Sequence, residues 1–164
     1  MTVEEIISQK LALVRKIWQK HQKRLQQDPK VQELLFQHQK AFQHAQAVMR
    51  LTGAEAFCAR CGRDGISCCG ADMELHCDDA LLVANLLCEV ELPSQRAFPK
   101  GCFFLGEEGC ILKVRPLICR NFICPELAAF LGPEKTRILQ ESLEGEARAL
   151  FLLGEKIRSL VLKS

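Results

Sequence analysis

The chain has 164 residues, the size of one ordinary domain, and it is long enough to bury a hydrophobic core without disulfide bonds. Its hydrophobic content is 48%, it has no Tyr and one Trp, and this composition favours packed helices over a large aromatic-rich sheet. Residues 1–52 hold nine Lys and Arg against four Asp and Glu, whereas residues 53–164 hold thirteen against sixteen. If eight cysteines bound metal as thiolates, their negative charge would make the loaded protein slightly acidic. A strong affinity for nucleic acid is therefore not expected.

The first segment, MTVEEIISQKLALVRKIWQK, has charges within every apolar stretch, and no small-residue cleavage site follows it. This pattern is unlike a signal peptide or a membrane span, so the sequence predicts a cytoplasmic protein without membrane contact. In a reducing compartment, ten cysteines indicate metal binding or redox chemistry more than disulfide bonds.

The sequence predicts two amphipathic helices, residues 3–25 and residues 29–52, that pair as an antiparallel hairpin. Each carries apolar side chains at three- and four-residue spacing, and Asp28 followed by Pro29 is typical of a helix start. The stripes are formed by Val3, Ile6, Ile7, Leu11, Val14, Ile17, Trp18 and Leu25, then by Val31, Leu34, Leu35, His38, Phe42, Ala45, Val48 and Met49.

The middle of the chain has a mixed pattern. Residues 58–70 are predicted to be a loop, because Gly and Cys replace the apolar periodicity. A helix should follow Asp78 or Asp79 and run to about Glu91 before Pro93. The stretch CFFLGEEGCILKV resembles a short β-hairpin with GEEG as its turn.

The remaining segments are predicted to be helical. A short helix should start at Pro116, another should lead from Pro125 to near Gly132, and a long one should cover residues 133–162. The whole is a mainly α single domain: a helical hairpin at 1–53, a cysteine-rich metal-binding segment at 54–131 and a C-terminal helix at 132–164.

Eight cysteines are the candidate metal ligands. Cys58 and Cys61 form a CxxC pair, whose spacing lets two sulfurs reach one metal ion. Eight thiolates match two closed four-cysteine sites, of zinc or of an iron–sulfur cluster, with Cys68 and its neighbour serving different ions. The first group is Cys58, Cys61, Cys68 and Cys69, and the second is Cys102, Cys110, Cys119 and Cys124.

Other residues near these cysteines carry a weaker signal. Arg115 and Arg120 bracket Cys119 and are candidates for cofactor binding, because a guanidinium offsets thiolate charge. The Cys124-Pro125 step also occurs in ferredoxins and slightly favours iron. Cys77 and Cys88 are interpreted as core packing, and His76 as a surface residue.

A family resemblance follows from these residues. CxxCGxxxxxxCCG, followed by GCFFLGEEGCILKVRPLICRNFIC, resembles the cysteine-cluster family described as zinc- or iron-chelating proteins, the YkgJ type. The resemblance covers about residues 57–125, although six residues separate Cys61 from Cys68 where the family has two, and Leu112 stands where Tyr is common. It implies metal chelation, and a related cluster is associated with a flagellin lysine methylation protein.

The sequence therefore predicts a metal-binding protein that holds iron–sulfur clusters, slightly preferred, or zinc, for electron transfer or redox sensing. One alternative is a zinc-stabilised interaction module that binds a protein partner through the basic hairpin, where Lys16, Lys20 and Lys23 form a ridge. A third is an oxidoreductase or methylation-linked enzyme component. The sequence contains no catalytic motif, and a closed four-cysteine site disfavours hydrolytic zinc chemistry.

Overall fold

The computed structural model describes residues 1–63 and 69–162 of the chain, so Cys68 lies outside the described residues. The fold is mainly helical, with long N-terminal helices, a long C-terminal helix and a short antiparallel hairpin, as the sequence predicted. None of the described helices is both long enough and apolar enough to cross a membrane.

Two long helices open the chain, α1 (Val3–Gln27) and α2 (Pro29–Thr52). The Asp28 side chain accepts hydrogen bonds from the backbone N–H groups of Lys30 and Val31, at 2.9 and 3.0 Å, and so separates the helices with a tight turn. Gly53 ends α2 with φ 88°, a left-handed conformation that favours glycine.

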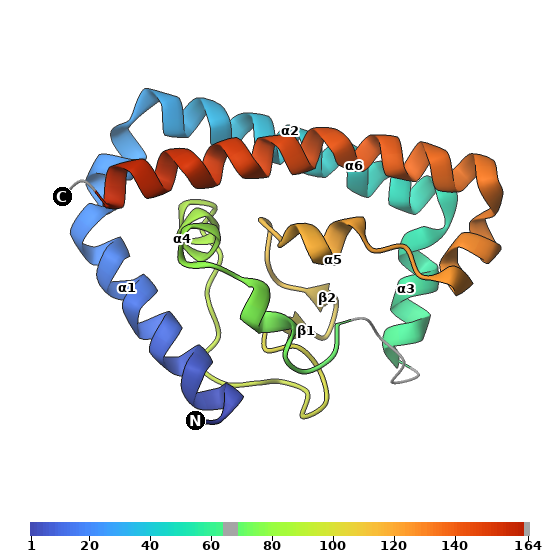
Figure 1. Cartoon of the computed structure of the whole chain (residues 1–164), viewed down its shortest axis with the longest axis horizontal. Helices are drawn as coiled ribbons and strands as arrows, with labels where there is room; N and C mark the ends of the chain where they lie inside the picture. The colour runs from blue at the N-terminus through green and yellow to red at the C-terminus, as the bar shows by residue number, and fades with distance from the viewer. Residues whose placement is uncertain (64–68, 163–164) are drawn as a thin grey trace.

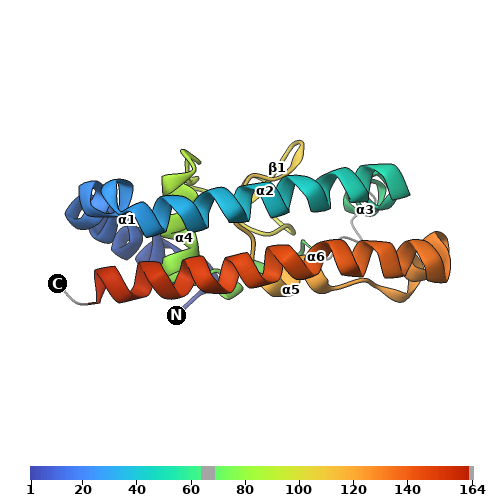
Figure 2. The same ribbon diagram turned by 90° about the horizontal axis from the view of Figure 1, so that it is seen from above.

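The long helices α2 and α6 (Pro125–Val161) lie side by side and run in opposite directions (Figures 1 and 2). They form the most extensive contact between elements in the described structure. Helix α1 leans away from α2 and packs mainly against α4 (Asp79–Leu87), so the two N-terminal helices enclose an angle where a closely paired hairpin was expected. The cysteine-rich middle of the chain fills the space below α2 and α6 in Figure 1.

Short elements make up this middle segment. After α2 come α3 (Ala54–Arg63), the 3-10 helix η1 (Met73–His76) and α4, then strands β1 (Leu105–Gly106) and β2 (Gly109–Cys110), and finally α5 (Leu117–Asn121). Leu105 pairs with Cys110 and Gly106 with Gly109, which confirms the predicted hairpin and its turn. Helix α6 breaks at Gly132, whose φ of 80° is not helical, at the position where the sequence predicted a boundary.

Two predicted boundaries were wrong. Residues 58–63 are helical, because α3 is anchored by Phe57, whose ring lies 5.0 Å from that of Phe130 on α6. Helix α4 ends at Leu87 and not near Glu91. Glu89 adopts a left-handed conformation with φ 62°, and the Val90 N–H then donates to the carbonyl of Asn85 at 3.0 Å, which closes the helix.

The buried side chains form a larger and a smaller cluster. The larger joins α1, α4, the end of α6 and the hairpin region, with Ile7, Leu82, Phe104 and Ile157 among its least exposed members. The smaller joins α2, α3 and the first half of α6 around Ala45 and Leu139. The cysteine-rich segment between them is therefore held from both ends by apolar packing.

Candidate metal centre

Five of the described cysteines line one cavity of about 60 Å³. They come from segments far apart in the sequence, and the thioether of Met73 and the guanidinium of Arg115 lie in the same wall. The five are Cys69, Cys77, Cys102, Cys110 and Cys119.

Backbone pairing brings Cys69 and Cys102 together. The Cys102 N–H donates to the carbonyl of Cys69 at 2.8 Å, and Gly70 and Gly101 form an isolated antiparallel bridge next to them. A Cβ at Gly101 would lie 2.9 Å from the end of the Leu105 side chain and 3.2 Å from the Phe98 Cβ, so a larger residue there would displace its neighbours. The close approach of these two segments therefore fixes one side of the cavity.

The hairpin places Cys102 and Cys110 in similar surroundings. The Phe104 N–H lies 3.5 Å from the Cys102 sulfur, and the Leu112 N–H donates to the Cys110 sulfur, which opposes the rise that burial causes in the pKa of Cys110. In both cases the donor is the amide two residues after the cysteine. Amides that point at sulfur stabilise the thiolate form that a metal requires.

Cys77 and Cys119 complete the lining from other elements. Cys77 follows η1 and is 2% exposed, and its carbonyl accepts a hydrogen bond from the Lys10 ammonium at 2.8 Å. Cys119 lies on α5 and is exposed as a whole residue, but its thiol is partly buried, and this burial is the main cause of the rise in its pKa. The thiols thus range from a buried end of the cavity at Cys77 to an open end at Cys119.

Two buried polar groups hold the cavity walls. Asn85 on α4 accepts from the N–H groups of Lys113 and Val114, at 2.9 and 3.0 Å, and donates to the carbonyl of Val114 at 2.8 Å. The fully buried carboxylate of Glu74 pairs with Arg96, which also donates to the carbonyl of Gly101. Both sets of bonds tie a cavity-lining loop to a helix.

Burial raises the pKa of four cavity thiols, those of Cys77, Cys102, Cys110 and Cys119. The pKa of Cys102 rises to about 12 and that of Cys119 to about 11, mainly because burial disfavours the charged thiolate. Cys110 lies within electrostatic range of each of the other four cavity cysteines, and thiolate repulsion adds to the rise in the pKa of Cys77. A bound cation would reverse this penalty, so metal binding and thiol deprotonation are coupled here.

Positive charge lies close to the sulfurs. Arg115 opposes the burial-driven rise in the pKa of Cys110 and of Cys119, and Lys10 does the same for the pKa of Cys77. The Arg115 side chain is held in place by the carbonyls of Leu112 and Cys110, at 2.8 and 3.2 Å. These two cations would offset part of the charge of a thiolate-bound metal.

The donor set is soft. The described residues that line the cavity include no imidazole or carboxylate, which disfavours Mg²⁺ and Ca²⁺ and suits zinc, copper(I) or iron–sulfur clusters. Across residues 1–63 and 69–162, no group of three or more His, Cys, Asp or Glu side chains is arranged so that it could hold a metal ion.

Three of the predicted cysteines lie elsewhere. Cys58 and Cys61 are on α3, and Cys124 caps α6 by accepting a hydrogen bond from the Leu127 N–H at 3.3 Å; none of the three is among the described residues that line the cavity. Arg120 forms an ion pair with Glu146 and is not in the cavity lining, but its charge opposes the rise in the pKa of Cys110 and Cys119, as that of Arg115 does.

The prediction that Cys77 packs in the core is confirmed, because it is 2% exposed and belongs to the larger hydrophobic cluster. Nothing in the sequence indicated that Cys77 also lines the cavity. Cys88, assigned to packing in the same way, lies against the larger hydrophobic cluster and outside the described cavity lining.

Comparison with known proteins adds no relative. No family model, curated protein or solved structure matches the chain. The resemblance to the cysteine-cluster family therefore rests on the residues alone.

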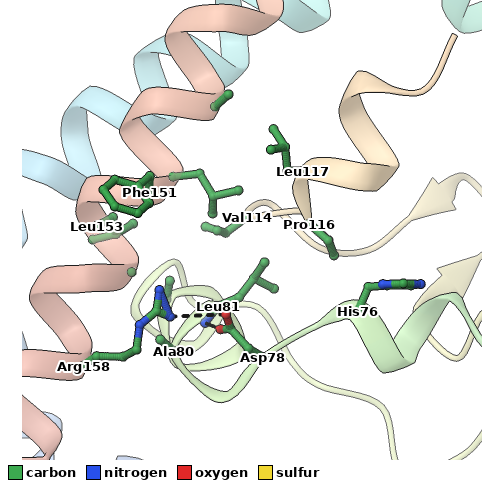
Figure 3. A pocket seen from close by; sticks show the side chains of 14 residues that line it. His76, Asp78, Ala80, Leu81, Val114, Pro116, Leu117, Phe151, Leu153 and Arg158 are labelled. Atoms are coloured by element: carbon green, nitrogen blue, oxygen red, sulfur yellow. Dashed lines mark hydrogen bonds and ion pairs between the residues drawn. The ribbon is translucent and has the colours of Figure 1, made fainter.

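A larger groove of about 230 Å³ adjoins the cavity (Figure 3). Its walls are mostly apolar and come from α4, α5 and α6, with Leu117 and Phe151 exposed at its rim. An ion pair of 3.2 Å between Asp78 and Arg158 lies at one end, and His76 lies at the other. Pro116 lines both the groove and the cavity, so the two spaces share a wall.

Proposed function

We propose that the protein is a metal–thiolate protein that holds an iron–sulfur cluster in the cysteine-lined cavity. The observation that carries the proposal is the meeting of five thiols from four separate segments around one space. Three of the five, Cys77, Cys102 and Cys110, also pack in or against the larger hydrophobic cluster. The resemblance to a zinc- and iron-chelating family supports the same proposal.

The positive charge beside the thiols favours a cluster over a single zinc ion. Arg115 and Arg120 both oppose the rise in the pKa of Cys110 and Cys119, and their charge would offset that of a thiolate-bound cluster.

The surroundings suit this chemistry. Cys102 and Cys110 each have a backbone amide directed at sulfur, and Arg115 lies beside them. Hydrogen bonds and positive charge near the sulfurs tune the reduction potential of such a group. When bound, a cluster would supply one-electron chemistry, and the proposed role is electron transfer or redox sensing in the cytoplasm.

The test is analysis of wild-type protein isolated without oxygen. We expect iron and acid-labile sulfide in similar amounts, together with a broad visible absorption that is lost on oxidation. A colourless protein with stoichiometric zinc and no sulfide would contradict the cluster.

A zinc-stabilised interaction module is the second candidate. The observation that favours it is the basic face of α1, where Lys16, Lys20 and Lys23 are all exposed and form no ion pair with another described residue. Such a face suits an acidic protein partner. Two results together would support this candidate. The isolated protein would contain stoichiometric zinc without sulfide, and a partner protein would bind less tightly when the three lysines are replaced by glutamate.

A further inference from the structure

Among residues 1–63 and 69–162, five thiols line the cavity, one more than a four-ligand site requires, and the five residues differ in exposure. Cys77 is 2% exposed, whereas Cys119 is exposed and the remaining three are intermediate. A metal–sulfur bond at a buried position is shielded from water and chelators, and one at the surface is not. The two extreme thiols therefore cannot be equivalent.

Resting on the proposed function, we propose that Cys77 is a ligand of the same centre and holds its buried end, whereas Cys119 at the open end is dispensable. With Cys69, Cys102 and Cys110, Cys77 completes a set of four sulfurs inside the cavity. The sequence pattern assigned Cys77 to the core and Cys119 to the ligands, so the inference reverses both roles.

The position of Cys77 is fixed by contacts independent of the sulfur. Its N–H donates to the carbonyl of Glu74 at 3.1 Å, and its carbonyl accepts from Lys10 on α1. Glu74 is itself locked by Arg96 and accepts from the Phe103 N–H at 3.4 Å, in the same loop as Cys102. These bonds hold the backbone so that the side chain lies in the cavity wall, the preorganisation that a ligand needs.

Cys88 provides a matched control. Its side chain is also partly buried, its pKa is also raised by burial, and its carbonyl also accepts from a lysine, Lys113, at 3.3 Å. It differs from Cys77 in lying outside the described cavity lining. If replacement of a buried thiol acts only through the fold, Cys77→Ser and Cys88→Ser should have the same effect. If Cys77 is a metal ligand, only Cys77→Ser should weaken metal binding.

The experiment compares wild type, Cys77→Ser, Cys119→Ser and Cys88→Ser after anaerobic isolation, with circular dichroism to confirm folding. We expect Cys77→Ser to lose its metal to EDTA about tenfold faster than wild type, while Cys119→Ser and Cys88→Ser stay within about twofold. Equal rates for Cys77→Ser and Cys88→Ser would overturn the inference, and so would a loss from Cys119→Ser as fast as that from Cys77→Ser.

A second measurement needs no variant and covers the case in which Cys77→Ser fails to fold. Wild-type protein, loaded or metal-free, is alkylated with iodoacetamide, and peptide mass spectrometry gives the rate at each cysteine. We expect loading to slow Cys77 about tenfold or more and to leave Cys88 and Cys119 nearly unchanged. Equal protection of Cys77 and Cys119, or none at Cys77, would contradict the inference. Wild-type protein without metal would instead contradict the proposed function.

Discussion

Arg120 and Glu146 form a two-armed ion pair inside the protein, with both N–O distances 2.7 Å. The two side chains are 4% and 2% exposed, and Arg120 also donates to Gln46 on α2 at 2.8 Å. Because Cys119 precedes Arg120 on the short helix α5, this pair sets the position of the open end of the cavity against α2 and α6.

Loss of this ion pair should destabilise the protein strongly. We expect Arg120→Ala to lower the free energy of unfolding by about 3–5 kcal/mol, because it leaves the Glu146 carboxylate buried without its partner. Urea denaturation measures the change. Arg137→Ala, which removes an exposed arginine paired with Glu134 and Glu141, should leave stability nearly unchanged. Similar effects from both variants would refute a structural role for the buried pair.

Asn85 should be equally hard to replace. Asn85→Leu removes the partners of the buried backbone groups of Lys113 and Val114, and we expect a loss of about 3 kcal/mol or more in unfolding free energy. The same substitution at exposed Asn121 should change the unfolding free energy by less than about 0.5 kcal/mol. If Asn85→Leu unfolds at the same urea concentration as wild type, the loop at 113–114 is held by other contacts.

Stability should fall in mild acid because of His38. Its side chain is fully buried, its Nε2 has no hydrogen-bond partner among the described residues, and burial lowers its pKa. Glu146 opposes this shift and Arg120 adds to it. In the unfolded chain, His38 binds a proton below about pH 6.5, whereas in the folded chain it does so only at lower pH. The free energy of unfolding therefore decreases as the pH falls through this interval.

The test is the urea midpoint at about pH 7.5 and about pH 5, in wild type and in His38→Leu. We expect the urea midpoint to fall less in His38→Leu than in wild type. A smaller fall should remain because of His21, whose pKa is also lowered, mainly by burial and further by the charges of Lys20 and Arg24. His44→Leu, at an exposed position on α2, should keep the wild-type drop. An unchanged drop in His38→Leu would show that the acid sensitivity arises elsewhere.

Cys110 should be required for metal binding. Because it lies within electrostatic range of the other four thiols, we expect Cys110→Ser to reduce the metal per chain to less than about half of the wild-type value. Cys88→Ala should keep its metal. Inductively coupled plasma mass spectrometry on anaerobically isolated samples gives the content, and full metal retention in Cys110→Ser would remove this residue from the site.

Local sequence signals were sufficient for most of the helices. The apolar stripes of α1 and α2, the Asp28 cap and the break at Gly132 all depend on neighbouring residues, and the structure confirms each. The helical character of Cys58 and Cys61 was missed because it depends on Phe57 packing against Phe130, a contact between distant segments.

The grouping of the sulfurs could not be predicted for the same reason. Spacing suggested that Cys58, Cys61 and Cys69 act together, whereas the bridge between Gly70 and Gly101 joins Cys69 to Cys102. That bridge depends on the path of the intervening loop, which spacing along the sequence does not reveal. Cys77 enters the group only because η1 is fixed from outside by Lys10 and Arg96.

X-ray absorption at the metal K edge of anaerobically isolated protein tests the central claim most directly. We expect iron surrounded by sulfur alone at about 2.3 Å, with a second iron as the next neighbour. A first shell of nitrogen or oxygen at about 2.0–2.1 Å, or protein that binds no metal when iron and sulfide are supplied, would contradict it.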